Sequence, residues 1–262
     1  MSKPEVLLFT VERGVATLTL NRPERLNALN LELKARLAQT ISEIGRRADI
    51  RAVVLSGSGR AFCSGGDIRE MDAGRSGREV RQRLLAMHHE VVIPLSRLEK
   101  PVIAAVNGPA VGAGFSLALA CDFIMAAEHA TFSMIFTQRG LVPDSGAAYM
   151  LPRLIGLSRA KELAFTGRTL DAAQAGQLGL VHRVVTAEAL LSESTAFAET
   201  LAQGASVAIG LTKRLLDQSL QSTIEEMAEF EACAAAIAVS TEDHAEGIKA
   251  FNEKRAPRFS GR

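Results

Sequence analysis

The chain has 262 residues, of which 47% are hydrophobic and 23% are charged, close to the average for globular domains. This length suits one large domain or two small ones, and the composition excludes disorder, collagen-like repeats and a coiled coil as the main architecture. Basic residues (30) balance acidic ones (29), so nothing in the net charge of +1 attracts nucleic acid or an anionic membrane. The cysteines are too few and too scattered for a disulfide framework or a zinc site, so we expect reduced thiols in a cytoplasmic protein: Cys63, Cys121 and Cys233.

Strands and helices alternate in the first half of the predicted chain. A hairpin is expected over residues 6–12 and 15–21, with Arg13-Gly14 at its turn. Apolar residues at helical spacing then predict a helix over 31–48. Further strands are expected at 52–55, 102–106 and 123–126, and further helices at 80–98, 160–166, 172–177, 187–202, 207–219 and 224–239. This order predicts an α/β core with parallel strands, followed by a helical C-terminal part.

No targeting segment or membrane span is expected. The N-terminal segment has neither a long apolar core nor a small-residue cleavage site. The uncharged stretch 101–121 is long enough to span a bilayer, but Asn107, Gly108 and Pro109 interrupt it. The residues before and after this break predict a buried strand, a turn and a buried helix.

Two glycine-rich turns are candidates for ligand binding. Gly65-Gly66 follows the strand predicted at 52–55, and Gly112-Ala113-Gly114 follows the one at 102–106; a helix is expected to begin after each. Glycine lets the backbone approach a ligand closely, and the start of a helix leaves N–H donors without partners. Two such turns facing each other would direct two N–H groups at one oxygen, as in an oxyanion hole. Either turn could also simply close a loop.

Asp144 lies between Pro143 and Ser145, ahead of an apolar helical segment. It could be the N-cap of that helix, since aspartate is a preferred N-cap residue. Alternatively, its carboxylate lies among Phe136, Leu141 and Val142, where desolvation would raise its pKa and make it a usable base.

Several ordered motifs resemble the crotonase family, also called the enoyl-CoA hydratase/isomerase superfamily. They are LNRPERLNALN (Leu20–Asn30), AFCSGGDIREM, KPVIAAVNGPAVGAGFSLALACDF, GLVPDSGAAYMLPRLIG, FTGRTLDAAQAGQLGLVHRVV and EGIKAFNEKRAPRF. The resemblance covers nearly the whole chain. It implies a spiral core of ββα units over residues 1–200 and a helical region over 201–262 that forms homotrimers, often paired into hexamers.

The resemblance also implies an acyl-CoA thioester ligand and no cofactor beyond the coenzyme A of the substrate. The backbone N–H groups of Gly66 and Ala113 would bind the thioester oxygen; Ala113 replaces a common glycine but keeps the main-chain donor. Phe251 and Lys254 match positions that reach CoA in relatives, in some from a neighbouring subunit. The other residues expected at the substrate are Leu26, Ala28, Ser64, Gly65, Asp67, Ile68 and Phe136.

The residues present favour one reaction over others in this family. Hydratases carry two glutamates, and the matching positions here are Ser116 and Phe136, neither of which is an acid. Asp144 matches the catalytic aspartate of the branch that isomerises ring epoxides of phenylacetyl-CoA, and related Δ3,Δ2-enoyl-CoA isomerases also use a single acid. We therefore expect an acyl-CoA isomerase with Asp144 as its acid and base.

Other functions remain open at this point. They are a hydratase-type lyase with atypical residues, a thioester-binding protein or scaffolding subunit with little catalysis, and an aryl-CoA dehalogenase. The dehalogenase branch uses an aspartate, a histidine and a tryptophan; His89 lies near the histidine position, Phe136 replaces the tryptophan, and the chain has no Trp. An exposed helical pair is the preferred interpretation of His88 and His89.

The remaining candidates have plain structural interpretations. Cys63 is expected to be a packed residue rather than a nucleophile, because no partner base is evident. Five histidines without a ligand-like spacing predict no metal site. A basic stretch is expected to be a solvated helix face, with contact to CoA phosphates as the weaker alternative: Arg69, Arg75, Arg78, Arg81 and Arg83. The acyl group would be selected by a wall formed by Met71, Leu84, His88 and Phe136.

Overall fold

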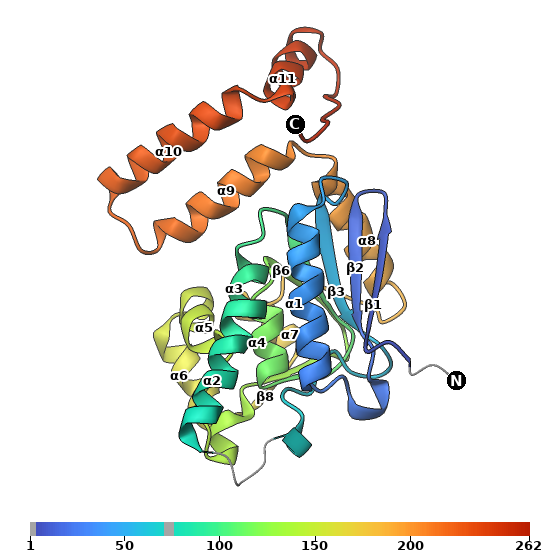
Figure 1. Cartoon of the computed structure of the whole chain (residues 1–262), viewed down its shortest axis with the longest axis vertical. Helices are drawn as coiled ribbons and strands as arrows, with labels where there is room; N and C mark the ends of the chain where they lie inside the picture. Colours follow the sequence, from blue (N-terminus) through green and yellow to red (C-terminus); the bar gives the residue numbers. More distant parts are fainter. Residues whose placement is uncertain (1–3, 71–75) are drawn as a thin grey trace.

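The computed structural model describes residues 4–70 and 76–262, so Met71 and Arg75 lie outside the described residues. Two sheets form the core (Figure 1), one with the strand order β1-β2-β3-β4-β6-β9 and one with the order β5-β7-β8. The strands are β1 (Leu7–Glu12), β2 (Val15–Leu20), β3 (Ala52–Gly57), β4 (Val102–Val106), β5 (Ala110–Val111), β6 (Phe123–Ala127), β7 (Thr131–Ser133), β8 (Thr169–Asp171) and β9 (Arg183–Val185). The expected α/β fold is confirmed.

Helices connect and cover these strands. The α-helices are α1 (Leu31–Arg46), α2 (Gly77–Met87), α3 (Ile93–Ser96), α4 (Ala113–Leu119), α5 (Ala147–Ile155), α6 (Leu157–Thr166), α7 (Ala172–Gln177), α8 (Leu190–Ala202), α9 (Ser206–Ser219), α10 (Ile224–Val239) and α11 (Glu242–Asn252). Short 3-10 turns are η1 (Pro23–Arg25), η2 (Ile68–Glu70) and η4 (Ile135–Arg139), and η3 (His88–Val92) is a π-helical turn.

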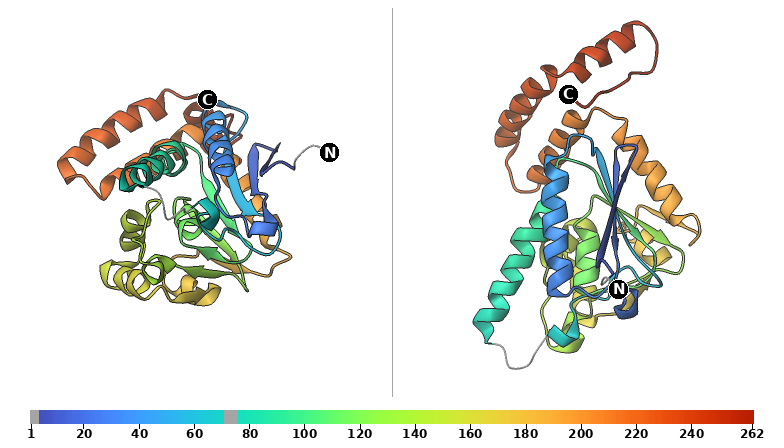
Figure 2. Two further views of the ribbon diagram at one scale, coloured as in Figure 1. Left: turned by 60° about the horizontal axis from the view of Figure 1, so that its bottom comes forward. Right: turned by 45° about the vertical axis from the view of Figure 1, so that its right-hand side comes forward.

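The larger sheet begins with the expected hairpin. Arg13 and Gly14 both have left-handed φ values, 48° and 79°, as a two-residue hairpin turn requires. β1 pairs with β2 antiparallel, whereas the pairs from β2 to β9 are parallel. Parallel strands are covered on both faces, which explains why every residue of β4 is buried. Figure 2 shows α1 on one side of this sheet and α8 on the other.

Helix α1 illustrates how the sequence pattern produces a covering helix. Asn30 is its N-cap, and the Asn30 side chain accepts a hydrogen bond from Leu33 N at 2.9 Å. Apolar residues at helical spacing, including Leu37, Ile41 and Ile44, are buried on one face, and charged residues occupy the other.

The uncharged stretch 101–121 contains β4, a break at Asn107–Pro109, the short strand β5 and helix α4. The expectation of a strand, a turn and a buried helix is therefore confirmed, with β5 as an addition. No helix within residues 4–70 and 76–262 is long and apolar enough to cross a membrane.

The helix expected over 80–98 is helical but not uniform. Helix α2 starts with a capping box formed by Ser76 and Glu79, and the π-turn η3 separates it from α3. The amide of Ile93 bonds to the carbonyl of His88, one residue further back than in an α-helix, directly before Pro94. Proline lacks an N–H and its ring needs space on the preceding turn, which a wider turn provides.

Helices α9, α10 and α11 stand apart from the sheets (Figure 1). The basic tail after α11 folds back onto that helix rather than reaching outward. The buried Asp243 carboxylate accepts hydrogen bonds from Ser260 N and Gly261 N, at 2.6 and 2.9 Å. Arg51, directly before β3, donates to the Phe259 carbonyl at 3.2 Å and so links the tail to the core. The division into residues 1–200 and 201–262 stays a prediction.

Candidate active site

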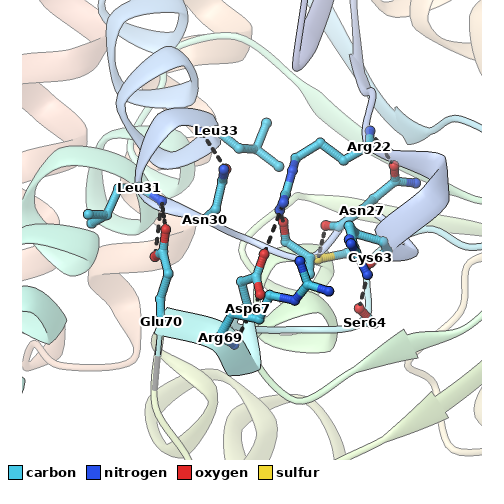
Figure 3. Close-up of polar contacts among 12 residues, drawn as sticks. Arg22, Asn27, Asn30, Leu31, Leu33, Cys63, Ser64, Asp67, Arg69 and Glu70 are labelled. Atoms are coloured by element: carbon cyan, nitrogen blue, oxygen red, sulfur yellow. Dashed lines mark hydrogen bonds and ion pairs between the residues drawn. The ribbon is translucent and has the colours of Figure 1, made fainter. Parts of the chain in front are cut away.

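The segment between β2 and α1 is held in an unusual backbone conformation. Leu26 and Asn27 both have positive φ, 50° and 56°, which side chains other than glycine rarely adopt. The buried Asn27 side chain stabilises this conformation, because its Nδ2 donates to the carbonyls of Ser58 and Ala61 at 2.9 and 2.8 Å. Its Oδ1 accepts from Arg22 N at 2.9 Å (Figure 3). The loop is therefore bound to the segment that follows β3.

An ion pair makes a second link between these two segments (Figure 3). Arg22 Nη2 lies 2.9 Å from Asp67 Oδ2, both side chains are largely buried, and Arg22 also donates to the Ala28 carbonyl. Burial alone would raise the pKa of Asp67. The hydrogen bond from Arg22, the Arg69 amide and the charges of both arginines outweigh this effect and leave the pKa of Asp67 below its ordinary value.

The first glycine turn forms short bridges to both flanking segments. Leu29 pairs with Gly66 and Cys63 pairs with Ala110, each as an isolated parallel bridge. The first glycine turn, which follows β3, therefore lies between the loop that precedes α1 and the second glycine turn.

The contact between the two glycine turns leaves no room for side chains. A Cβ on Gly114 would lie 2.2 Å from the Cys63 carbonyl oxygen, and a Cβ on Gly65 would lie 2.8 Å from the Val111 carbonyl oxygen. Gly65 also has a φ of 94°. Both positions therefore require glycine, and the expected approach of the two turns is present.

Two backbone amides at this contact are available to a ligand. Among the described residues, neither Gly66 N–H nor Ala113 N–H donates a hydrogen bond. Ala113 is the first residue of α4, as expected of a helix start. After Gly66, however, the described residues up to Glu70 form the 3-10 turn η2 and not an α-helix.

A cavity of about 140 Å³ opens beside these amides. Its walls come from the loop before α1 and the start of α1, from both glycine turns, from α2 and η4, and from the segment before α5. They comprise Leu29, Lys34, Ser64, Gly65, Gly66, Ile68, Arg83, Leu84, Met87, Val111, Gly112, Ala113, Ile135, Phe136, Arg139, Leu141, Asp144 and Ser145. Among the described lining residues, Asp144 is the one acid.

Asp144 lines the cavity and is not an N-cap. Helix α5 begins after Gly146, and Asp144 contributes only its carbonyl, which accepts from Ala147 N at 3.1 Å. The Ser145 hydroxyl donates to Asp144 Oδ1 at 3.0 Å, and Ser145 has a left-handed φ of 51°. Such backbone strain persists where the surrounding structure enforces it, commonly at functional sites.

The surroundings of Asp144 shift its pKa upward. Burial is the main cause, and it outweighs the Ser145 hydrogen bond and the positive charges of His88 and Lys34, which act in the opposite direction. Phe136 and Leu141 lie on the same cavity wall, as expected, but Val142 is 75% exposed and does not line it.

The cavity brings together many of the predicted site residues but not all of them. Those that line it are Ser64, Gly65, Gly66, Ile68, Ala113, Phe136 and Asp144. Leu26, Ala28 and Asp67 lie outside the lining, and Asp67 is paired with Arg22 instead. Phe251, in α11, and Lys254, just after it, belong to the C-terminal region that stands apart from the sheets.

Several residues differ from their sequence-based interpretation. His88 is half-buried, its Nδ1 bonds the Leu84 carbonyl at 2.9 Å and its charge acts on Asp144, so only His89 is an exposed helical residue. Arg83 lines the cavity rather than being only part of a solvated face. Lys34 and Arg139 also line it. The helical spacing of Leu33, Leu37, Ile41 and Ile44 indicated the buried face of this helix and gave no signal for Lys34.

Cys63 and Ser116 are packed residues without a role in the cavity. Cys63 is fully buried, which raises the pKa of its thiol to about 12, so it is a packed and unreactive residue. Ser116 is fully buried, its hydroxyl donates to the Gly112 carbonyl at 3.1 Å, and it does not reach the cavity.

Comparison with known families and proteins gives a consistent result. The family model described as enoyl-CoA hydratase/isomerase matches residues 10–262. The 1,2-epoxyphenylacetyl-CoA isomerase of Escherichia coli is 39% identical over 260 residues, covering 98% of this chain and 99% of the relative. A protein of Rhizobium meliloti named probable enoyl-CoA hydratase is 38% identical over 258 residues, with the same coverage of 98% and 99%.

Solved structures agree with these relatives. The enoyl-CoA hydratase of Bacillus anthracis has a TM-score of 0.93 at 36% identity, covering 98% of this chain and all of that one. The enoyl-CoA hydratase/isomerase of Cupriavidus metallidurans has a TM-score of 0.91 at 39% identity, covering all of this chain and 98% of that one.

Replacing Asp67 with asparagine should destabilise the protein in a pH-dependent way. At neutral pH we expect Asp67→Asn to lower the free energy of unfolding by about 1–3 kcal/mol, because the charge-assisted bond from Arg22 is lost. The pKa of Asp67 is lowered by folding, so the pair stabilises the protein above a pH of about 4, and this stabilisation is lost as the pH falls through the folded-state pKa. The difference between wild type and variant should therefore shrink in acid.

Urea unfolding at neutral and progressively lower pH measures this difference. Asp171→Asn is the matched control, since asparagine serves equally well as the N-cap of α7 and little change is expected. Equal stability of wild type and Asp67→Asn at neutral pH would contradict a role of the pair in holding the turn.

Proposed function

Because this chain belongs to the enoyl-CoA hydratase/isomerase family, we propose that its cavity isomerises an acyl-CoA thioester, with Asp144 as the single acid and base. The observation that carries this proposal is that Asp144 is the one acid among the described residues lining the cavity. The reaction would move a double bond or open a ring epoxide, and both begin next to the thioester carbonyl.

The two backbone amides support the first part of this mechanism, which is the stabilisation of negative charge on the thioester oxygen. The N–H groups of Gly66 and Ala113 would donate to the thioester oxygen, whose negative charge grows as a proton leaves the adjacent carbon. Donors that are already oriented stabilise such a charge without reorganisation, and removing one typically slows a reaction about 10²–10³-fold. Both amides belong to tightly packed backbone turns, which keeps them in place.

The raised pKa of Asp144 supports the second part of this mechanism, which is the proton transfer. Its carboxylate would take a proton from the carbon next to the thioester carbonyl, leaving an enolate. The same group, now protonated, would return that proton to another carbon of a double-bond substrate, so no atom is gained or lost. A raised pKa makes Asp144 a stronger base than an ordinary aspartate and a competent acid in the return step.

Hydration by a pair of acids is less well supported. The two positions that carry glutamates in hydratases are Ser116, which is buried outside the cavity, and Phe136, which is an apolar wall residue. Neither can orient or deprotonate a water molecule as a carboxylate does. A single aspartate beside an apolar wall favours the transfer of a proton between two carbons of the substrate over the addition of water.

Coenzyme A would enter as part of the substrate, without a further cofactor. Ser64, Gly65 and Ile68 line the cavity and would contact the substrate next to the thioester, while Leu26 and Ala28 lie on the adjoining loop. Phe251 is 82% exposed, and in Figures 1 and 2 α11 lies at the other end of the molecule from η2. Phe251 and Lys254 would therefore reach the CoA bound to another copy of the chain.

A homotrimer, alone or paired into a hexamer, accounts for the exposed apolar residues of the C-terminal helices. Large apolar side chains are exposed in and between α9, α10 and α11, namely Leu216, Leu220, Ile224, Phe230, Ile237, Val239, Ile248 and Phe251. Many large exposed apolar side chains on neighbouring helices are typical of an interaction site.

Asp144→Asn should remove most isomerase activity and leave the fold intact. With a 3-enoyl-CoA substrate, the ultraviolet absorbance of the conjugated 2-enoyl thioester should rise for the wild type and rise about 10²–10⁴-fold more slowly for the variant, because the proton carrier is lost. Circular dichroism of both proteins controls for folding, and a ring-epoxide substrate is the second to assay. Full activity of the variant on a substrate that the wild type converts would disprove the role of Asp144.

The acid limb of the pH profile should depend on His88. The Asp144 base must be ionised, so kcat/KM should fall as the pH drops through a pKa above the ordinary aspartate value of about 3.9. The charge of His88 lowers the pKa of Asp144, and removing it in His88→Gln should move this limb to higher pH. His89→Gln is the matched control and should leave it in place. A limb unmoved by His88→Gln would contradict this coupling.

Charged substitutions in α10 should disrupt the proposed oligomer. Light scattering of the native protein should give three or six times the mass of the chain, and Ile237→Asp should lower it. Leu157→Asp, at a residue of α6 that is similarly exposed, is the control and should leave the mass unchanged. A wild-type protein that is monomeric at micromolar concentration would refute the oligomer.

A further inference from the structure

The cavity carries two arginines that the proposed mechanism does not use. Arg83 comes from α2 and Arg139 from the end of η4, and both line the cavity while remaining exposed to solvent. Within the described part of the chain, neither forms an ion pair or a side-chain hydrogen bond. Two guanidinium groups that line one cavity and form no ion pair would bind an anion placed beside them favourably.

Within the described part of the chain, neither arginine forms an ion pair with Asp144. The cations whose charges act on the Asp144 carboxylate are His88 and Lys34, not Arg83 or Arg139. Arg83 precedes His88 by five residues on the same helical run, which is about 7.5 Å at 1.5 Å per residue. Both guanidinium groups are therefore available to an anionic group of a ligand.

Apolar side chains line the cavity from the same elements that carry the two arginines. Met87 is one helical turn beyond Arg83 and on the same face of α2. Leu84 directly follows Arg83 in the sequence. Phe136 lies one turn before Arg139 in η4. All three apolar residues line the cavity. The cavity thus combines one acid, an apolar wall and two guanidinium groups among its described lining residues.

We propose that the acyl group of the substrate ends in a carboxylate, so that the cavity accepts a dicarboxylic acyl-CoA thioester; this inference rests on the proposed function. The apolar wall contacts the methylene chain, and Arg83 and Arg139 bind the terminal carboxylate. The planar guanidinium presents paired donors that match the two oxygens of a carboxylate. The arginines therefore determine specificity and take no part in the proton transfer.

An anion at this position could also come from the phosphates of coenzyme A. The segments that would contact CoA in the proposed function are the loop at Leu26–Ala28 and the turn at Ser64–Gly66, whereas both arginines come from α2 and η4. The elements that carry the arginines are those that also carry the apolar wall. This placement favours the acyl group as the source of the anion, and the two sources are separated by experiment.

Calorimetric titration with two unreactive ligands tests the inference. Hexanoyl-CoA and adipoyl-CoA have acyl chains of equal carbon number and differ in the terminal carboxylate. The wild type should bind adipoyl-CoA about tenfold more tightly, as expected of one charge-assisted interaction at a solvent-exposed position. Arg83→Gln and Arg139→Gln should each reduce this preference, and Arg81→Gln, an exposed residue of α2 outside the cavity lining, should retain it.

Each other result overturns the inference. Equal affinity of the wild type for both ligands, or a preference that neither substitution reduces, would show that no carboxylate is recognised. An equal loss of affinity for both ligands in the variants would assign the arginines to the CoA phosphates. The binding preference does not depend on turnover, so Asp144→Asn should keep it, and failure of isomerase activity is thereby distinguished from failure of carboxylate recognition.

Discussion

The close approach of two backbone segments governs the site. The chain leaves β3 and β4 at neighbouring positions in the sheet, and the two following turns meet with Gly114 against the Cys63 carbonyl and Gly65 against the Val111 carbonyl. At these separations even one methyl group would overlap a backbone oxygen. Because the peptide groups themselves form the contact, the amides of Gly66 and Ala113 acquire fixed positions that side chains could not provide as rigidly.

Polar side chains of neighbouring segments stabilise the contact between the two glycine turns. The Asn27 side chain and the Arg22–Asp67 pair hold the loop before α1 against the first turn, and they do so with buried, fully engaged polar groups. Asp67 thus has a structural task in this chain, and its expected contact with the ligand stays a prediction. On the opposite wall, the left-handed Ser145 and its hydroxyl fix the Asp144 carboxylate. The acid and the amides come from separate layers, so the cavity forms only when the whole core is assembled.

The sequence predicted those features that depend on local pattern. Strand β4 and helix α10 have the expected bounds, because a buried β-branched run and a capped helical repeat are self-contained signals. Strands β5, β7, β8 and β9 have two or three residues each and exist only through pairing with distant segments, which periodicity cannot report. The same reason applies to the site. The glycine turns and Asp144 were recognisable, whereas the positions of Arg139 and Lys34 depend on tertiary packing.

The distribution of charge in the cavity reconciles two opposing requirements. A cation close to Asp144 would lower its pKa and weaken it as a base, yet an anionic ligand needs cations to bind it. Among the described residues, the cations that act on Asp144 are His88 and Lys34, and burial outweighs them. Arg83 and Arg139 line the same cavity and present positive charge to it without forming an ion pair with Asp144. Two unpaired guanidinium groups and a carboxylate of raised pKa are compatible in one cavity because the burial of Asp144 outweighs the positive charges that act on it.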